Sequence, residues 1–98
     1  MVNNSFIQYL SSTLQKESVL TASIQEVVPV SGGSVNQTFR VSSLNESVFL
    51  KLNSRSLYPQ MFEKEKRGLA LLKSSTPLHV PEALSIGEFE DLAYLVLE

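Results

Sequence analysis

Lys51 is the residue whose type and position most directly suggest chemistry. It lies in the apolar segment 48–52, where a lysine is unexpected. Because side chains of a strand alternate between two faces, Lys51 should share a face with Phe49 and Asn53, opposite to Leu50. A lysine can simply lie on a solvated sheet face, but a fully solvated face rarely carries a phenylalanine. A ring and an ammonium group side by side suit a nucleotide, with the ring against the base and the ammonium against a phosphate.

Glu65 is the second candidate, on a helix predicted over residues 60–74. Helical spacing places three large residues on the apolar stripe of this helix, Phe62, Leu69 and Leu72. Glu65 belongs to the same stripe, where a carboxylate is costly unless it is paired. A long glutamate can instead bend out to solvent. If the helix packs on the sheet, Glu65 should reach Lys51 and hold it in position for a phosphate.

A turn with two glycines precedes the lysine strand. It contains Gly32, Gly33 and Ser34, and Asn36 follows. Glycines let backbone N–H groups approach a phosphate, and Ser34 and Asn36 add donors. Paired glycines between strands are usually only a hairpin turn, and the pattern is not a Walker loop because no Gly-Lys-Ser/Thr follows. In this order, the turn, the strand lysine and the helix glutamate are typical of the nucleotide-binding half of a kinase-like fold.

Seven elements are predicted to position these residues. An amphipathic helix spans residues 4–16, with Asn4 or Ser5 as its cap. Pro29 places the first strand at an edge of the sheet. The predicted strands span residues 24–31, 38–43, 47–53, 83–87 and 92–97. The fold class is therefore α+β: a five-stranded antiparallel sheet with a packed helix, as in a kinase N-terminal lobe, plus an N-terminal helix.

Composition narrows the class of protein. Ninety-eight residues, 43% of them hydrophobic and 18% charged, predict one small globular domain over residues 1–98. The net charge of −2 gives no electrostatic reason to bind nucleic acid or an anionic membrane. No apolar run approaches the roughly 20 residues of a membrane span. The absence of cysteine excludes disulfides and fits a reducing compartment, so we expect a cytoplasmic protein.

The sequence has one histidine, His79, and one aspartate, Asp91. A lone loop histidine is far more often structural than a metal ligand. Asp91 lies in a predicted hairpin turn, where aspartate commonly makes local hydrogen bonds. Kinase-type phosphoryl transfer needs a catalytic aspartate and further metal ligands, and one aspartate cannot fill both roles. We therefore expect no catalytic and no metal-binding residue in this chain, and no kinase activity from it alone.

Six segments resemble the fructosamine kinases, in the order that the family has them: residues 31–41, 48–53, 61–65, 68–72, 80–84 and 94–98. The resemblance covers the N-terminal lobe of that family. The Met-Phe-Glu-x-Glu segment after a Phe-x-Lys strand is fairly specific to it. The lysine and the glutamate alone are shared with aminoglycoside, choline and protein kinases.

The resemblance implies binding of ATP with Mg²⁺. Lys51 would contact the α- and β-phosphates, and Glu65 would orient it. Phe49 would line the adenine pocket, and Glu98 would begin the hinge, its backbone carbonyl accepting from the adenine amino group. The phosphates would be covered by the turn that contains Gly32, Gly33, Ser34 and Asn36. The family phosphorylates fructosamines and other ketosamines, and its catalytic aspartate, metal ligands and substrate pocket lie in a C-terminal lobe, which we expect to be absent from this chain.

Two other classes of protein remain open at this stage. One is another small-molecule kinase of the same superfold, such as an aminoglycoside or choline kinase. The other is a non-enzymatic α+β interaction domain in which Lys51 and Glu65 form a structural ion pair. For the isolated chain we expect self-association or weak ATP binding, because apolar surface that a second lobe would cover is left exposed.

Overall fold

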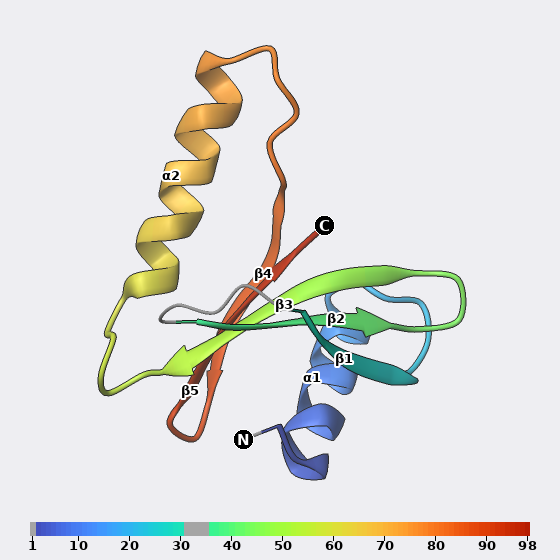
Figure 1. Ribbon diagram of the computed structural model, residues 1–98. Coiled ribbons are helices and arrows are strands. Elements are labelled where there is room, and N and C mark those ends of the chain that lie inside the picture. The colour runs from blue at the N-terminus through green and yellow to red at the C-terminus, as the bar shows by residue number, and fades with distance from the viewer. Residues whose placement is uncertain (1, 31–35) are drawn as a thin grey trace.

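The computed structural model describes residues 2–30 and 36–98 (Figure 1). Seven elements occur in the predicted order, and their bounds lie within two residues of the predicted ones. They are α1 (Asn4–Lys16), β1 (Glu26–Val30), β2 (Gln37–Ser42), β3 (Ser47–Ser54), α2 (Met61–Ser75), β4 (Ala83–Phe89) and β5 (Leu92–Leu97). In the described part of the chain, no helix has the length and apolar character that crossing a membrane requires.

The five strands form one antiparallel sheet, in the order β1-β2-β3-β5-β4. The first three strands are a meander, and the β4–β5 hairpin joins it through pairing of β5 with β3. The strand that contains Pro29 lies at an edge, as its missing N–H predicts. The predicted fold class is therefore confirmed.

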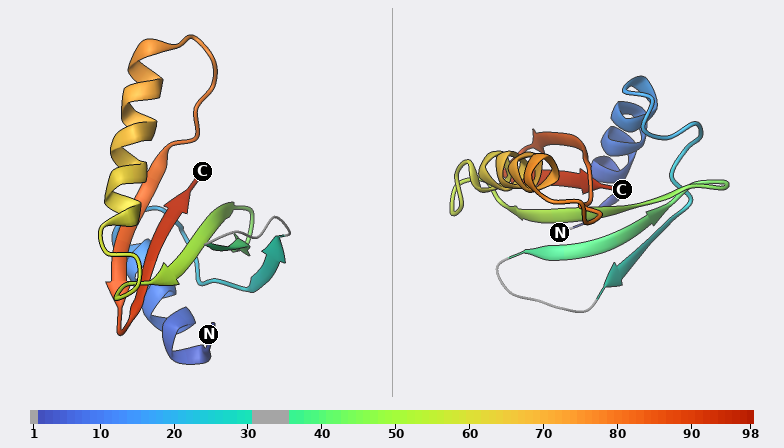
Figure 2. Two further views of the ribbon diagram at one scale, coloured as in Figure 1. Left: turned by 60° about the vertical axis from the view of Figure 1, so that its left-hand side comes forward. Right: turned by 90° about the horizontal axis from the view of Figure 1, so that it is seen from above.

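One face of β3 and both faces of β5 are covered. On one face, Leu50 and Leu52 of β3 and Tyr94 and Val96 of β5 pack with α1. The apolar stripe of α1 consists of Phe6, Leu10 and Leu14, all fully buried. On the other face, Leu95 and Leu97 of β5 pack with Phe62 of α2. The two helices lie apart from each other in both views of Figure 2, so each holds its own face of the sheet.

The cap of α1 differs from the prediction. Asn3, rather than Asn4 or Ser5, precedes the helix with an extended backbone, and its Oδ1 accepts a hydrogen bond from the Phe6 N–H at 2.9 Å. Asn4 is already the first helical residue, so it cannot cap. A side-chain oxygen at this position satisfies one of the unpaired N–H groups of the first turn.

The apolar stripe of α2 is shorter than predicted. Phe62 is buried and Leu69 is partly buried in the same cluster, but Leu72 is 54% exposed. The sheet ends before the helix does: the C-terminal half of α2 rises beyond the strands beside the loop that leads to β4 (Figure 1). The position of Leu72 on the stripe was right, but nothing in the described part of the chain covers it.

Candidate nucleotide-binding site

Two rows of residues cross the sheet on the face that α2 partly covers. One row consists of Val30, Thr38, Lys51, Leu95 and Ile86, and the other of Val28, Arg40, Phe49, Leu97 and Ala83. At the β4–β5 end, both rows pack with α2. At the β1–β3 end they are open, with Phe49 42% exposed and Val30 39% exposed. Half of this face is therefore a core and the other half is an accessible floor.

Lys51 stands at the boundary between the covered half and the open half. Its Nζ lies 2.6 Å from Oε2 of Glu65, and the two side chains are 27% and 25% exposed. Phe62, buried one helical turn before Glu65, anchors α2 on the sheet and turns Glu65 towards the lysine. The contact predicted from the sequence is therefore present. An ammonium group has three donors, and this contact uses one of them.

The open half offers apolar side chains beside the ammonium group, with Thr38 and the exposed Arg40 of β2 between them. Phe49 precedes Lys51 by two residues on the same face, and Val28 and Val30 approach from the edge strand. The sequence analysis did not single out the two valines. Which way they face depends on the register between β1 and β2, and the alternation within 26–30 is too short to fix it alone. Such a surface next to a lysine can accept a ring against its apolar side chains and an anion against the ammonium group.

The glycine turn is only partly visible. Gly32, Gly33 and Ser34 lie outside the described residues. The side chain of Asn36 accepts through Oδ1 a hydrogen bond from Nδ2 of Asn53 at 3.1 Å. The end of the turn is thereby held on the same face of the sheet as Lys51.

Asn53 is a residue of this site that the sequence analysis placed on the correct face without giving it a role. It is only 4% exposed, and its Nδ2 also lies 3.2 Å from Sδ of Met61, the first residue of α2. One amide therefore joins the turn, the lysine strand and the start of the helix. Its buried Oδ1 accepts from no donor in the part of the chain that the structure describes. The sequence feature that could have revealed this role is an asparagine two residues after Lys51, at a position predicted to share a face of the sheet with that lysine.

Glu98 follows the row that contains Phe49, because its neighbour Leu97 pairs with Phe49 across β3 and β5. Its N–H donates to the carbonyl of Glu82, and its Oε1 accepts from the N–H of Glu82, both at 3.1 Å. Nε2 of His79 lies 3.1 Å from the same Oε1. This contact lies at the surface, where the His79 side chain is 80% exposed.

Asp91 lies in the β4–β5 turn and makes contacts that the sequence did not reveal. Its carboxylate accepts from Ser54 and Ser56, in the connection between β3 and α2. The hydrogen bond from the Ser54 hydroxyl, with that from Ser56, lowers the pKa of Asp91 below its usual value. Among residues 2–30 and 36–98, no three histidine, aspartate or glutamate side chains are grouped to hold a metal ion.

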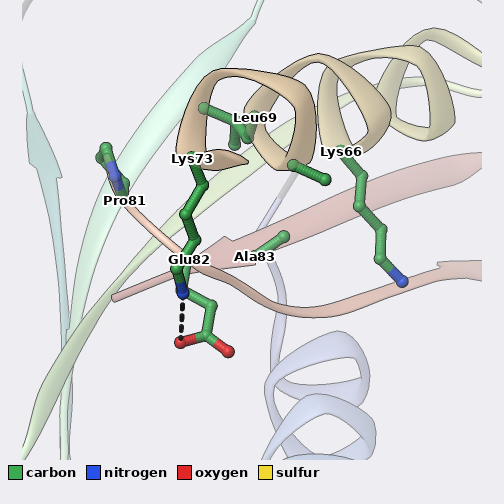
Figure 3. Close-up of a pocket in the computed structure, with 7 residues that line it drawn as sticks. Lys66, Leu69, Lys73, Pro81, Glu82 and Ala83 are labelled. Carbon is green, nitrogen blue, oxygen red and sulfur yellow. Dashed lines mark ion pairs between the residues drawn. The ribbon is translucent and has the colours of Figure 1, made fainter. Parts of the chain in front are cut away.

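A pocket of about 200 Å³ lies at the covered end of this face, between α2 and the start of β4 (Figure 3). Lys66, Leu69 and Lys73 of α2 line one side, and Pro81, Glu82 and Ala83 line the other. Lys73 closes one end through an ion pair with Glu82 at 3.7 Å, drawn as a dashed line. None of the predicted nucleotide-binding residues lines this pocket.

Comparison with known proteins shows which family the chain resembles. The family model described as fructosamine kinase matches residues 6–98. A probable ketoamine kinase of Vibrio parahaemolyticus is 31% identical over 90 residues, and one of Enterococcus faecium is 38% identical over 73 residues. The chain belongs to the fructosamine kinase family.

A solved structure supports the same assignment. A crystal structure from Haemophilus somnus, of a candidate fructosamine-3-kinase, is 30% identical and superposes with a TM-score of 0.77 over 91% of this chain. The fold of this fructosamine kinase family member is therefore kinase-like. The match favours this family over the aminoglycoside kinases, the choline kinases and the non-enzymatic interaction domain.

The chain spans about 30% of the length of the Vibrio relative and of the solved structure, and 25% of the Enterococcus relative. The matched region includes the sheet, both helices and the Lys51–Glu65 contact.

Proposed function

We propose that residues 1–98 form the ATP-binding lobe of a kinase that phosphorylates ketosamines. The observation that carries this proposal is the 2.6 Å contact between Lys51 and Glu65, at the edge of the open half of the sheet face that carries Phe49. Family membership supplies the reaction class, because the relatives are named as probable ketoamine kinases. A structural ion pair would need neither the exposed Phe49 nor the open half of the sheet.

In this proposal each described residue has a distinct part in binding ATP. Phe49 and the valines of β1 receive the adenine ring. Lys51 contacts the α- and β-phosphates with the donors that Glu65 leaves free, and Glu65 keeps the ammonium in place. Asn36 and the turn with Gly32, Gly33 and Ser34 cover the phosphates. The backbone carbonyl of Glu98 accepts from the adenine amino group.

The transfer moves the γ-phosphoryl group from ATP to a hydroxyl of the ketosamine. The bond between the γ-phosphorus and the bridging oxygen breaks and leaves ADP, while a new bond forms to the substrate oxygen, whose proton passes to a base. Positioning and charge stabilisation dominate such reactions, and Lys51 supplies both to the phosphates. The described residues do not fit a Mg²⁺ site, so the metal ligands, the base and the ketosamine pocket belong to other residues.

The decisive experiment compares three variants of the intact protein in ketosamine phosphorylation with ATP and magnesium. Lys51→Ala should lower kcat/KM by about 10²–10³, the usual value of a charge that stabilises a transferring phosphoryl group. Glu65→Gln should lower it in the same direction but less, because it acts through Lys51. Lys64→Ala, which removes an exposed lysine from the same helix, is the matched control and should change little.

Unfolding by denaturant separates this role from a structural one. A partly exposed ion pair contributes only about 0–1 kcal/mol to stability. Lys51→Ala and Glu65→Gln should therefore fold normally while losing activity. Unchanged kinetics in Lys51→Ala would refute the proposed role, and activity against aminoglycosides but not ketosamines would refute the proposed substrate class.

A further inference from the structure

The connection between β3 and α2 joins the two halves of the Lys51–Glu65 contact. Lys51 lies three residues before the end of β3 at Ser54, and Glu65 lies in the second turn of α2. Any change in the course of residues 55–60 moves the helix relative to the strand. The position of Glu65 therefore depends on what holds this connection.

The start of α2 has few contacts of its own besides that of Asn53 with Met61. Its cap residue, Gln60, has a left-handed backbone with φ 61°, and its side chain makes no capping hydrogen bond. Phe62 is the only residue among Met61–Ser75 that is buried. Phe62 and the partly buried Leu69 hold the helix on the sheet, and Asn53 contacts Met61. With no side-chain cap at its start, the direction in which the first turn begins also depends on what holds the connection before it.

Asp91 supplies contacts that hold this connection. Its Oδ2 accepts from the Ser54 hydroxyl at 2.9 Å and from the Ser56 hydroxyl at 3.2 Å, and its Oδ1 accepts from the Ser56 N–H at 3.1 Å. Its backbone carbonyl accepts from the Arg55 N–H at 2.7 Å. Four hydrogen bonds from one residue therefore fix the first half of the connection to the β4–β5 turn.

These contacts continue into the helix. The Ser54 hydroxyl, held by Asp91, accepts from the Leu57 N–H at 3.2 Å, and the Ser54 carbonyl accepts from the Tyr58 N–H at 3.0 Å. The Tyr58 carbonyl in turn accepts from the N–H of Met61, the first residue of α2, at 3.3 Å. An unbroken series of hydrogen bonds thus runs from the Asp91 carboxylate to the start of the helix.

We propose that Asp91 is a positioning residue for the phosphate-binding lysine: it fixes the β3–α2 connection, and thereby the direction of α2 and the contact of Glu65 with Lys51. Asp91 does not touch the nucleotide in this arrangement. The expected effect of Asp91 on activity rests on the proposed function. Its expected effect on the position of α2 does not.

The first test measures amide hydrogen exchange without nucleotide, so that it is independent of the proposed function. In the intact protein, Asp91→Ala should speed exchange at residues 57–65 by about tenfold, as expected when hydrogen bonds to a charged group are lost. Asp91→Asn keeps the acceptor for the Ser56 N–H and should restore most of the protection. Glu90→Gln, which removes a charge from the same turn, should leave exchange unchanged.

The second test asks whether Asp91 acts through Glu65. Asp91→Ala should lower kcat/KM for ketosamine phosphorylation by about tenfold in the natural background, but little further in a Glu65→Gln background, since coupled residues are not additive. Full additivity in this cycle would overturn the proposal, as would unchanged exchange at residues 57–65 in Asp91→Ala. If Lys51→Ala is fully active while exchange responds as expected, the proposed function fails and the positioning of α2 stands.

A double substitution tests the same proposal even where Asp91→Ala fails to fold. The double substitution Ser54→Ala with Ser56→Ala removes the two hydroxyl donors from the opposite side and leaves Asp91 in place. It should speed exchange over the same residues in the same direction. Protection equal to that of the natural protein would overturn the proposal.

Discussion

At the scale of single residues, Lys51 and Glu65 matter because of their position and not because of the strength of their contact. Both side chains are about one quarter exposed, so solvent screens the pair and its net contribution to stability is small. The same exposure leaves the ammonium accessible to an anion on the open side of the sheet. A fully buried pair would not present the ammonium group to an anion, and its desolvation would cost more free energy.

Tyr94 behaves in the opposite way, because its environment penalises its charged form. Burial under α1, with smaller contributions from Tyr9 and Glu17, raises the pKa of Tyr94 to about 12. The folded-state pKa lies above the ordinary value of about 10, so the stabilisation is complete below pH 10 and is lost as pH rises through 12.

We therefore expect the unfolding free energy to fall between pH 10 and pH 12, and to fall less in Tyr94→Phe. Denaturant titrations at several pH values measure this difference. The tyrosinate absorbance should show Tyr94 ionising last, together with unfolding. If Tyr94→Phe and the natural protein lose stability in parallel across this window, the attribution to Tyr94 is wrong.

At the scale of elements, close packing of the β4–β5 hairpin under α1 depends on a glycine. Gly87 pairs with Tyr94 across the hairpin, and a Cβ at Gly87 would lie 2.5 Å from the Tyr94 hydroxyl oxygen. The ring cannot easily move, because it is buried between the sheet and Phe6, whose ring centroid lies 6.0 Å away. The absence of a side chain here is what allows α1 to cover the sheet closely.

Gly87→Ala should therefore lower the unfolding free energy by about 1–3 kcal/mol, the usual cost of overpacking. Gly68→Ala is the matched control. Gly68 lies in α2, and a Cβ there would meet no neighbouring side chain within 4 Å, so alanine should raise stability by about 0.5–1 kcal/mol through helix propensity. Thermal or denaturant unfolding measures both, and equal effects of the two substitutions would contradict this account.

At the scale of the whole molecule, the open half of the α2 face determines what the isolated chain can do. Phe49, Val30 and the charged Arg40 are exposed on that half, and Lys51 lies at its border. In the proposed function such a surface would hold a nucleotide from one side only. The Vibrio relative and the solved structure are about three times as long, so contacts from further residues are to be expected in them.

We expect the isolated 98-residue chain to bind ATP at about millimolar affinity or weaker, which corresponds to about 4 kcal/mol or less of binding free energy. Calorimetric titration measures the affinity, and sedimentation measures whether the exposed face drives self-association. No ketosamine phosphorylation above a no-enzyme control is expected from the same preparation. Micromolar binding by a clean monomer would show that the site is complete within these residues.

The sequence by itself determined the elements, the fold class and the Lys51–Glu65 pairing. Alternation in β3 and helical spacing in α2 are local properties of the chain, and a carboxylate on an apolar stripe predicts a partner without further information. The edge position of β1 followed from Pro29 for the same reason, because a missing N–H acts wherever the strand lies.

Only the tertiary structure decided the rest. The exposure of Leu72, the valines of the open floor and the linkage of Asn53 to Asn36 and Met61 depend on where the sheet ends and on the register between strands. The contacts of Asp91 join residues separated by 35 to 37 positions in the sequence. No spacing rule within one element contains such information, because it arises when the β4–β5 turn folds back against the end of β3.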